Sequence, residues 1–312
     1  MRDRSGNGSA RYEPREDAFH QPRLGVVFVQ HDRAKHRRGL PTLLGGLSRL
    51  SAESTVVVTD NLHPGDWTHS VTADLHHIGG DNEGWEFSAF DRGIDWLRRD
   101  GDEPDLYVLA TDALLAYGRE FLELVDDLVI DCTRRHSVCV GWIDSFMQRC
   151  EVLGYSYDAW LRSSLLLVPR TVLAKLRPLV APLDDTLLFG ESPLAPFRPD
   201  APISANLQRL LLDWLTTNGR ARTGLERAWH SRFPLAEETF ELFKSKVKAI
   251  LREHLLSARL RALGYGCYDL RAIHRARDLG LLDVAMPGTR ALEWQWLAWR
   301  HDAGERELEA SG

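Results

Sequence analysis

The sequence lacks the features that most directly announce a membrane, secreted or metal-binding protein. It has no apolar run approaching the ~20 residues that a membrane-spanning helix needs. Its first residues carry no hydrophobic segment after their positive charges, so they do not form a secretory signal. Its four cysteines include no Cys-x-x-Cys pair, which argues against a zinc knuckle or a disulfide framework. These absences predict a cytoplasmic protein with reduced thiols.

An excess of positive charge is also missing. The formal net charge is −6, whereas binding to nucleic-acid phosphates requires a basic face, so we do not expect a general nucleic-acid binder. The chain has no Walker phosphate loop, no Gly-x-Ser-x-Gly elbow and no His-Glu-x-x-His helix. The common catalytic motifs therefore leave the function open.

What the chain does contain is typical of a folded protein. It has 312 residues, of which 44% are hydrophobic, and 10 of them are tryptophan. This is enough to bury a sizeable core without covalent cross-links. Residues 1–22 are rich in Gly, Ser, Arg and acidic residues and predict a disordered tail.

The segment 23–203 alternates short, β-branched apolar runs with stretches of helical periodicity. We expect strands at 24–29, 55–59, 75–78, 105–109, 137–142 and 164–168. This alternation predicts an α/β fold with a mostly parallel sheet flanked by helices. Prolines interrupt the pattern between 182 and 202, which indicates a loop or lid. Residues 204–312 predict a helical C-terminal region, with helices near 207–215, 225–229 and 240–260.

Polar side chains follow several of the predicted strands. Asp60 and Asn61 end the second strand, Asp81 and Asn82 follow the third, and Asp112 follows the fourth. Open α/β sheets bind ligands outside the carboxyl ends of their strands. The sequence therefore predicts a binding site at this edge.

The segment 79–118 carries a family resemblance. A Gly-rich turn with Asn82 and Gly84 opens a helix that carries Asp91, and a hydrophobic strand then ends at Asp112. This order of motifs resembles nucleotide-sugar glycosyltransferases of the type A fold, particularly bacterial rhamnosyltransferase-like enzymes of polysaccharide biosynthesis. The resemblance covers roughly residues 24–260. It departs from the family pattern at the strand end, where one carboxylate stands in place of an acidic pair.

The resemblance implies specific roles for these residues. Asp112 would bind Mg²⁺ or Mn²⁺, and the catalytic base would be Asp185 or Glu191 in the Pro-rich segment. The implied donor-binding residues are Asp60, Asn61, Asp81, Asn82, Gly84, Asp91 and Asp112. Sugar stacking is a further hypothesis for three tryptophans, Trp85, Trp142 and Trp160, although an isolated tryptophan more often belongs to a core.

The implied activity is transfer of a hexose or deoxyhexose, with inversion, from a nucleoside diphosphate sugar to a glycan or lipid-linked acceptor. A basic loop at residues 33–38 would suit peripheral contact with the inner face of a membrane. One alternative is a nucleotidyltransferase-like enzyme, although no Gly-rich loop follows the first strand. Another is a non-catalytic scaffold of a polysaccharide assembly.

Overall fold

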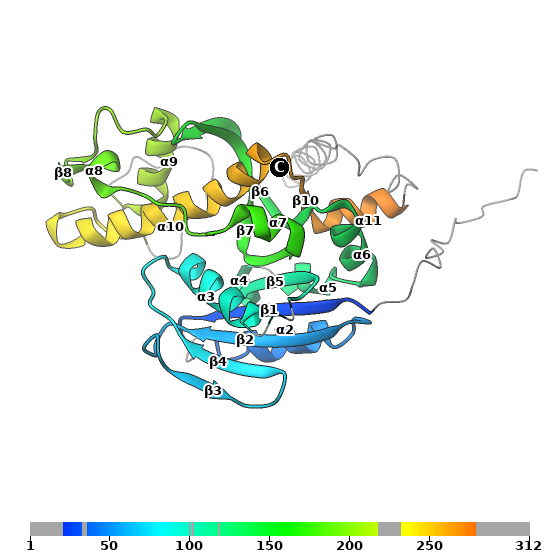
Figure 1. Cartoon of the computed structure of the whole chain (residues 1–312). Helices are drawn as coiled ribbons and strands as arrows, with labels where there is room; N and C mark the ends of the chain where they lie inside the picture. Colours follow the sequence, from blue (N-terminus) through cyan, green and yellow to red (C-terminus); the bar gives the residue numbers. More distant parts are fainter. Residues whose placement is uncertain are drawn as a thin grey trace, which may run out of the picture.

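A computed structural model describes residues 21–32, 36–99, 101, 103–117, 119–217 and 232–278. Within these residues, eight strands form one sheet in the order β10-β6-β7-β5-β1-β2-β4-β3 (Figure 1). The strands are β1 (Arg23–Gln30), β2 (Glu53–Asp60), β3 (Thr68–Ser70), β4 (Leu75–Gly79), β5 (Leu106–Thr111), β6 (Cys139–Val152), β7 (Tyr155–Pro169) and β10 (Cys267–Asp269).

The sheet is mixed. The pairs β1–β2, β1–β5, β2–β4 and β6–β10 are parallel. The pairs β3–β4, β5–β7 and β6–β7 are antiparallel. The parallel half of the sheet therefore joins its other half through β7, which runs against both of its neighbours.

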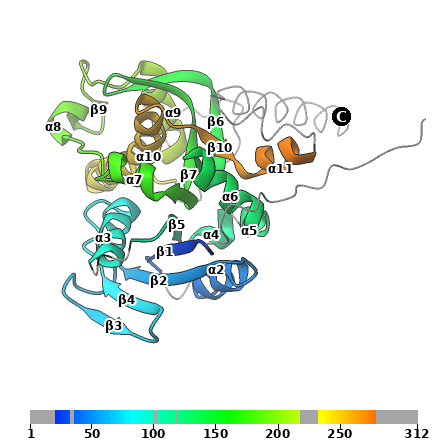
Figure 2. The ribbon, with the colours of Figure 1, turned by 45° about the vertical axis from the view of Figure 1, so that its right-hand side comes forward.

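Helices cover both faces of the sheet (Figures 1 and 2). Val26 and Phe28 of β1 point to one core, whereas Val27 and Val29 point to the other, as the alternation of a strand requires. The first core is covered by α2 (Gly39–Leu47), α4 (Leu114–Tyr117), α5 (Arg119–Glu123), α6 (Asp127–His136) and α11 (Leu270–Asp278). The second is covered by α3 (Glu86–Arg98), α7 (Arg170–Leu176) and α10 (Glu237–Ala262).

A third hydrophobic core lies where β6 and β7 extend past the rest of the sheet. It is closed by α8 (Asp185–Leu188), β8 (Phe189–Ser192), β9 (Ala195–Phe197), α9 (Ala205–Leu215) and residues 240–258 of α10. Leu256 and Leu260 of α10 belong to the second core, and the helix packs against β7. One helix thus belongs to both cores and joins the C-terminal part to the sheet.

The expected α/β class and strand positions are confirmed, but the prediction of a mostly parallel sheet is wrong for its second half. β6 and β7 are longer than predicted because they form a hairpin joined by Leu153 and Gly154, both with positive φ, at 49° and 79°. Two such residues form the tight turn that suits the twist of paired strands. The segment expected to be a loop or lid contains α8, β8 and β9.

Several predicted segments fall partly or wholly outside the described residues. These are the tail up to residue 20, residues 33–35 of the basic loop, the helix near 225–229 and the region after residue 278. Among the helices that the structure does describe, none is both long and apolar enough to cross a membrane. All four cysteines lie in the described part and are buried thiols.

The glycine at the end of β4 gives a test of this packing. A Cβ atom on Gly79 would lie 1.7 Å from the Pro64 carbonyl oxygen, whereas one on Gly45, in α2, would meet nothing within 4 Å. We expect Gly79→Ala to lower the free energy of unfolding by roughly 1–3 kcal/mol or more. The control Gly45→Ala should raise it by up to about 1 kcal/mol. Urea denaturation measures both changes, and equal stability of the two variants would contradict this register.

Candidate functional site

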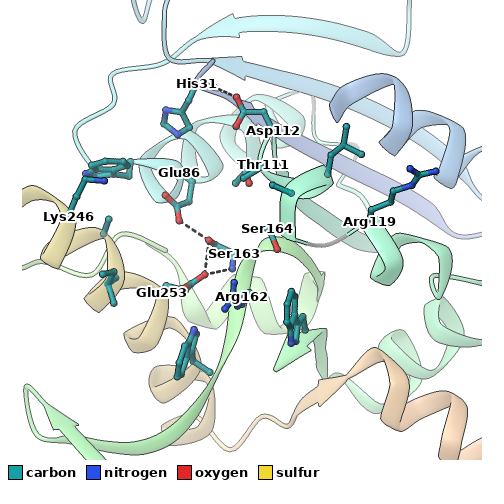
Figure 3. A pocket seen from close by; sticks show the side chains of 18 of the residues that line it. His31, Glu86, Thr111, Asp112, Arg119, Arg162, Ser163, Ser164, Lys246 and Glu253 are labelled. Carbon is teal, nitrogen blue, oxygen red and sulfur yellow. Dashed lines mark hydrogen bonds between the residues drawn. The ribbon is translucent and has the colours of Figure 1, made fainter. Parts of the chain in front are cut away.

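A cavity of about 820 Å³ opens beyond the carboxyl ends of β1 and β5 (Figure 3). Its position follows from the strand order. β1 pairs with β2 on one side and with β5 on the other. The chain that follows β1 therefore leads to one side of the sheet, and the chain that follows β5 leads to the other. Such a reversal leaves a crevice outside the strand ends, where α/β proteins bind ligands.

β7 forms another side of the cavity. It pairs with β5 through its final part, residues 165–169, and its earlier part continues past the end of β5. This overhang places Trp160, Arg162, Ser163 and Ser164 in the cavity wall. Because α10 packs along β7, it contributes further lining residues from the far side.

Aromatic rings form much of the wall. The Trp142 ring stacks on Phe121, with centroids 4.6 Å apart, and the Arg162 guanidinium lies 4.5 Å from the centroid of the Trp142 ring. Stacking fixes the orientation of this indole before any ligand enters. The tryptophans that line the cavity are Trp85, Trp142, Trp160 and Trp214.

Trp85 adopts an unusual backbone conformation directly before α3. Its φ is 56° and its ψ is −136°, a region that residues with a side chain rarely occupy. Its indole Nε1 donates to the Ser245 hydroxyl of α10 at 3.1 Å, which holds the ring in place. The turn before α3 therefore aims Trp85 into the space between α3 and α10.

Asp112 joins the loops that follow β1 and β5. Its side chain is 4% exposed, and its Oδ2 accepts hydrogen bonds from the backbone N–H groups of His31 at 2.7 Å and Asp32 at 2.8 Å. A carboxylate that accepts two N–H groups is a strong acceptor. Asp112 therefore fixes the start of the β1–α2 loop at the cavity mouth.

His31 reaches the cavity from that loop. Burial lowers its pKa below the ordinary value, although the charges of Asp112 and Asp60 act in the opposite direction. Its Nδ1 lies 3.3 Å from Asn61 Nδ2, which also donates to Asn82 Oδ1 at 3.2 Å. Burial therefore favours the neutral imidazole, which Asn61 contacts and Asn82 supports through Asn61.

Two carboxyl groups and one serine meet at the centre of the cavity wall (Figure 3). Ser163 Oγ lies 2.7 Å from Glu86 Oε1 and 2.9 Å from Glu253 Oε1. The Ser163 backbone N–H donates to Glu253 Oε1 at 2.6 Å. The three residues come from α3, β7 and α10, so this contact forms only when these elements pack together.

Burial changes the acidity of both carboxyl groups, and the charge of Glu253 also acts on Glu86. Burial, followed by the charge of Glu253, raises the pKa of Glu86 from its ordinary 4.5 to about 7, against smaller opposing contributions that include the Ser163 hydrogen bond and Arg252. Burial also raises the pKa of Glu253, whereas Arg162 and the hydrogen bonds from Ser163 act to lower it. Near neutral pH the cluster can therefore hold a proton that an exposed pair of glutamates would release.

Arg162 is oriented by an acid on the neighbouring strand. Its Nε lies 3.0 Å from Asp144 Oδ2, and its Nη2 contacts the same oxygen. Both side chains are partly buried, at 21% and 16% exposed. The pair keeps the guanidinium beside Trp142 and close enough to Glu253 to affect the pKa of that residue.

Of the predicted donor-binding residues, Asp112 lines the cavity, and several others lie directly behind it. Asp60 is fully buried and accepts from the Leu62 N–H at 3.0 Å. Asp81 Oδ1 accepts from the Glu83 N–H at 3.0 Å and from the Ser88 hydroxyl at 2.8 Å. These contacts shape the loop after β2 and the turn before α3, which carries Trp85.

The same loops contain Asn61, Asn82 and Gly84. The two asparagines reach the cavity through His31. Gly84 is buried, and a Cβ atom there would lie 2.9 Å from both Ser88 Cβ and Val180 Cγ2. Its role in this structure is close packing at the start of α3.

Asp91 does not line the cavity. It accepts from Arg177 Nε at 3.0 Å and from the backbone N–H groups of Leu179 at 2.7 Å and Val180 at 3.1 Å. This set of contacts holds the loop after α7 against α3. The structure therefore gives Asp91 a fold-stabilising position away from the predicted donor site.

Asp185 and Glu191, the predicted bases, also lie outside the cavity lining. Asp185 begins α8 and forms an ion pair with Lys248 of α10 at 2.8 Å. Glu191 lies in β8, at the third core. Their catalytic roles stay predictions that the geometry does not favour, because cavity-lining carboxyl groups are supplied by other residues.

The described residues do not fit a metal ion held by protein side chains alone. No group of three or more His, Cys, Asp or Glu in this part of the chain is placed to hold one. One oxygen of Asp112 is already engaged by two N–H groups. Mg²⁺ can be bound through one or two carboxylates together with substrate phosphates. The requirement for Mg²⁺ or Mn²⁺ therefore stays a prediction.

No motif in the sequence singles out Glu86, Ser163 or Glu253 as functional residues. Glu86 follows the Gly-rich turn directly, and Ser163 is a polar residue before an apolar strand run. Glu253 stands among the apolar residues of a helix face. None of these residues stands out alone, because they come together only in the folded protein. Ser163 is 77 residues from Glu86 and 90 residues from Glu253 along the chain.

Comparisons with known proteins add no family assignment: neither a protein-family model nor a curated sequence matches the chain.

The raised pKa of Glu86 gives a pH test of the site. A carboxyl group whose pKa is higher in the folded state stabilises the fold at low pH, and this contribution is lost as pH rises from 4.5 through about 7. Glu86→Gln stays uncharged, so the melting temperature of this variant should rise relative to that of the wild type as pH increases from 5 to 8. The control Glu241→Gln, an exposed position on α10, should keep the wild-type pH dependence. Parallel curves for Glu86→Gln and wild type would refute the assignment.

Proposed function

We propose that this protein is a glycosyltransferase that transfers a hexose or deoxyhexose from a nucleoside diphosphate sugar to a glycan or lipid-linked glycan acceptor. The donor would bind at the corner formed by His31 and Asp112, and transfer would invert the anomeric carbon. The acceptor would enter between β7 and α10.

The observation that carries this proposal is the position of Asp112. It stands at the carboxyl end of β5, beside β1, and it lines the 820 Å³ cavity while anchoring the β1–α2 loop. This is the place where α/β sheets bind nucleotides. It is also the position at which the resemblance to type A glycosyltransferases puts an acid at the donor diphosphate. The mixed sheet flanked by helices is compatible with that fold.

The cavity lining suits a sugar. Indole rings offer flat apolar surfaces, which match the apolar faces of a pyranose ring. Glu86, Glu253 and Ser163 supply hydrogen-bonding groups in the same cavity lining. This combination of stacking surfaces and carboxyl groups favours a carbohydrate over a purely apolar ligand.

Cationic side chains lie at the two sides of the cavity. Lys246 comes from α10 and Arg119 from α5, on opposite sides of the view in Figure 3. A departing nucleoside diphosphate carries negative charge, and nearby cations stabilise that charge as it develops. In the proposed reaction these two residues would attract the donor and favour departure of the nucleotide.

The donor site can be tested by calorimetric titration of UDP-, GDP- and dTDP-sugars, each with and without Mg²⁺ or Mn²⁺. We expect one nucleotide class to bind, and Asp112→Ala to weaken that binding at least tenfold, because the loop loses its anchor. Asp112→Asn retains an oxygen that can accept from His31 and Asp32, so it should preserve metal-independent binding. A loss confined to the metal-dependent part in Asp112→Asn would assign the remaining oxygen to a cation.

A matched control is Asp131→Asn on α6, where the side chain pairs with Arg135 outside the cavity lining. It should bind the nucleotide sugar like the wild type. Absence of binding to every nucleotide sugar would overturn the proposal. Product analysis separates the reaction classes, since glycosyl transfer releases a nucleoside diphosphate and nucleotidyl transfer releases pyrophosphate.

A further inference from the structure

The Glu86–Ser163–Glu253 cluster contains a proton-counting constraint. A hydroxyl group has one proton, and Ser163 Oγ lies within hydrogen-bonding distance of a carboxyl oxygen on each side. If both glutamates were ionised, one of these contacts would place two acceptors against each other. Both contacts are hydrogen bonds only when one of the carboxyl groups carries a proton.

The surroundings indicate which glutamate is protonated. Burial raises the pKa of Glu253, but its contacts with the Ser163 N–H and its position near Arg162 favour the ionised form, with Asp144 acting against them. Glu86 is buried and faces the charge of Glu253, with Arg252 acting in the other direction. The consistent arrangement has Glu86 donating to Ser163 Oγ and the Ser163 hydroxyl donating to the ionised Glu253.

We propose that these three residues form a hydrogen-bond relay in the cavity wall, in which Glu253 is the general base for an acceptor hydroxyl group and Glu86, which keeps its proton, is a positioning residue that acts through Ser163. This inference rests on the proposed glycosyl transfer and names its catalytic base. It replaces the Pro-rich segment, which does not line the cavity, with residues that do.

In the proposed transfer, the acceptor hydroxyl oxygen forms a bond to the anomeric carbon, and its proton passes to Glu253. The bond between the anomeric carbon and the phosphate oxygen breaks, and its electron pair leaves with the nucleoside diphosphate. The proton leaves Glu253 for solvent after the products depart. Glu86 stays protonated throughout and keeps the Ser163 hydroxyl directed at Glu253.

The test compares two variants that replace a carboxyl group with an amide at different places. Glu253→Gln has no basic oxygen of comparable strength, so the transfer rate should fall by at least about 100-fold while nucleotide-sugar binding is retained. In Glu86→Gln the amide N–H₂ can donate to Ser163 Oγ as the protonated carboxyl group does, so the transfer rate should fall far less, by about tenfold at most. Glu241→Gln, on the same helix as Glu253, is the control. A Glu253→Gln variant that keeps its rate, or a Glu86→Gln variant that loses as much as Glu253→Gln, would overturn the relay.

A substrate-free measurement keeps the relay distinguishable from the proposed function. At pH 6 the wild-type protein should show the infrared band of a buried protonated carboxyl group, and Glu86→Gln should lack it. The band should weaken in the wild type as pH rises through about 7. Its presence with no nucleotide-sugar binding would refute the glycosyltransferase and leave the shared proton established. Its absence at pH 6 would refute the relay even if sugar transfer is observed.

Discussion

The antiparallel pairing of β7 between β5 and β6 is the constraint on which the site depends. Five residues of β7, 165–169, pair with β5, and the rest of this strand must continue beyond the sheet edge at which β5 ends. That continuation carries Ser163 past the strand-end residue Asp112 and gives α10 a surface to pack on. Without it, the crevice beside β1 would be open on one side, and two of the acids that line it would have no common partner.

The cavity combines two electrostatic environments within one wall. At the β1 and β5 ends, backbone N–H groups stabilise the carboxylate of Asp112 and fix a loop. At the β7 overhang, low solvation and a second acid favour a retained proton on Glu86. The neighbours of these two acids thus differ, and a protein can assign distinct roles to similar side chains in this way.

Much of the fold could be predicted from the sequence because its cause is local. The buried strand runs at 24–29 and 55–59 are continuous and β-branched, and the structure has β1 and β2 there. The antiparallel course of β7 could not be predicted, because its apolar pattern is the same in either direction. The direction is fixed by the hairpin at Leu153 and Gly154, where a leucine occupies a conformation that sequence patterns assign to Gly or Asn.

The site was predictable to a smaller extent. Asp112 could be singled out because a strand-end acid is visible in the sequence, and it lines the cavity, while its binding role stays a prediction. Asp91 resembled a ligand-binding residue, yet its carboxylate is engaged by Arg177 and two backbone N–H groups. A carboxylate serves a loop or a ligand according to what packs against it, and that information lies in segments far apart along the chain.

Helix α10 lines the cavity and also contacts elements on several sides of it. Along 26 residues it contacts Trp85 through Ser245, holds Glu253 at Ser163, and reaches the carbonyl groups of Leu179 and Pro178 through Arg259. Ser245 and Glu253 lie on the same helix as Phe240 and Phe243 of the third core. A shift of α10 against that core would therefore also change the distance between the carboxyl groups of Glu86 and Glu253.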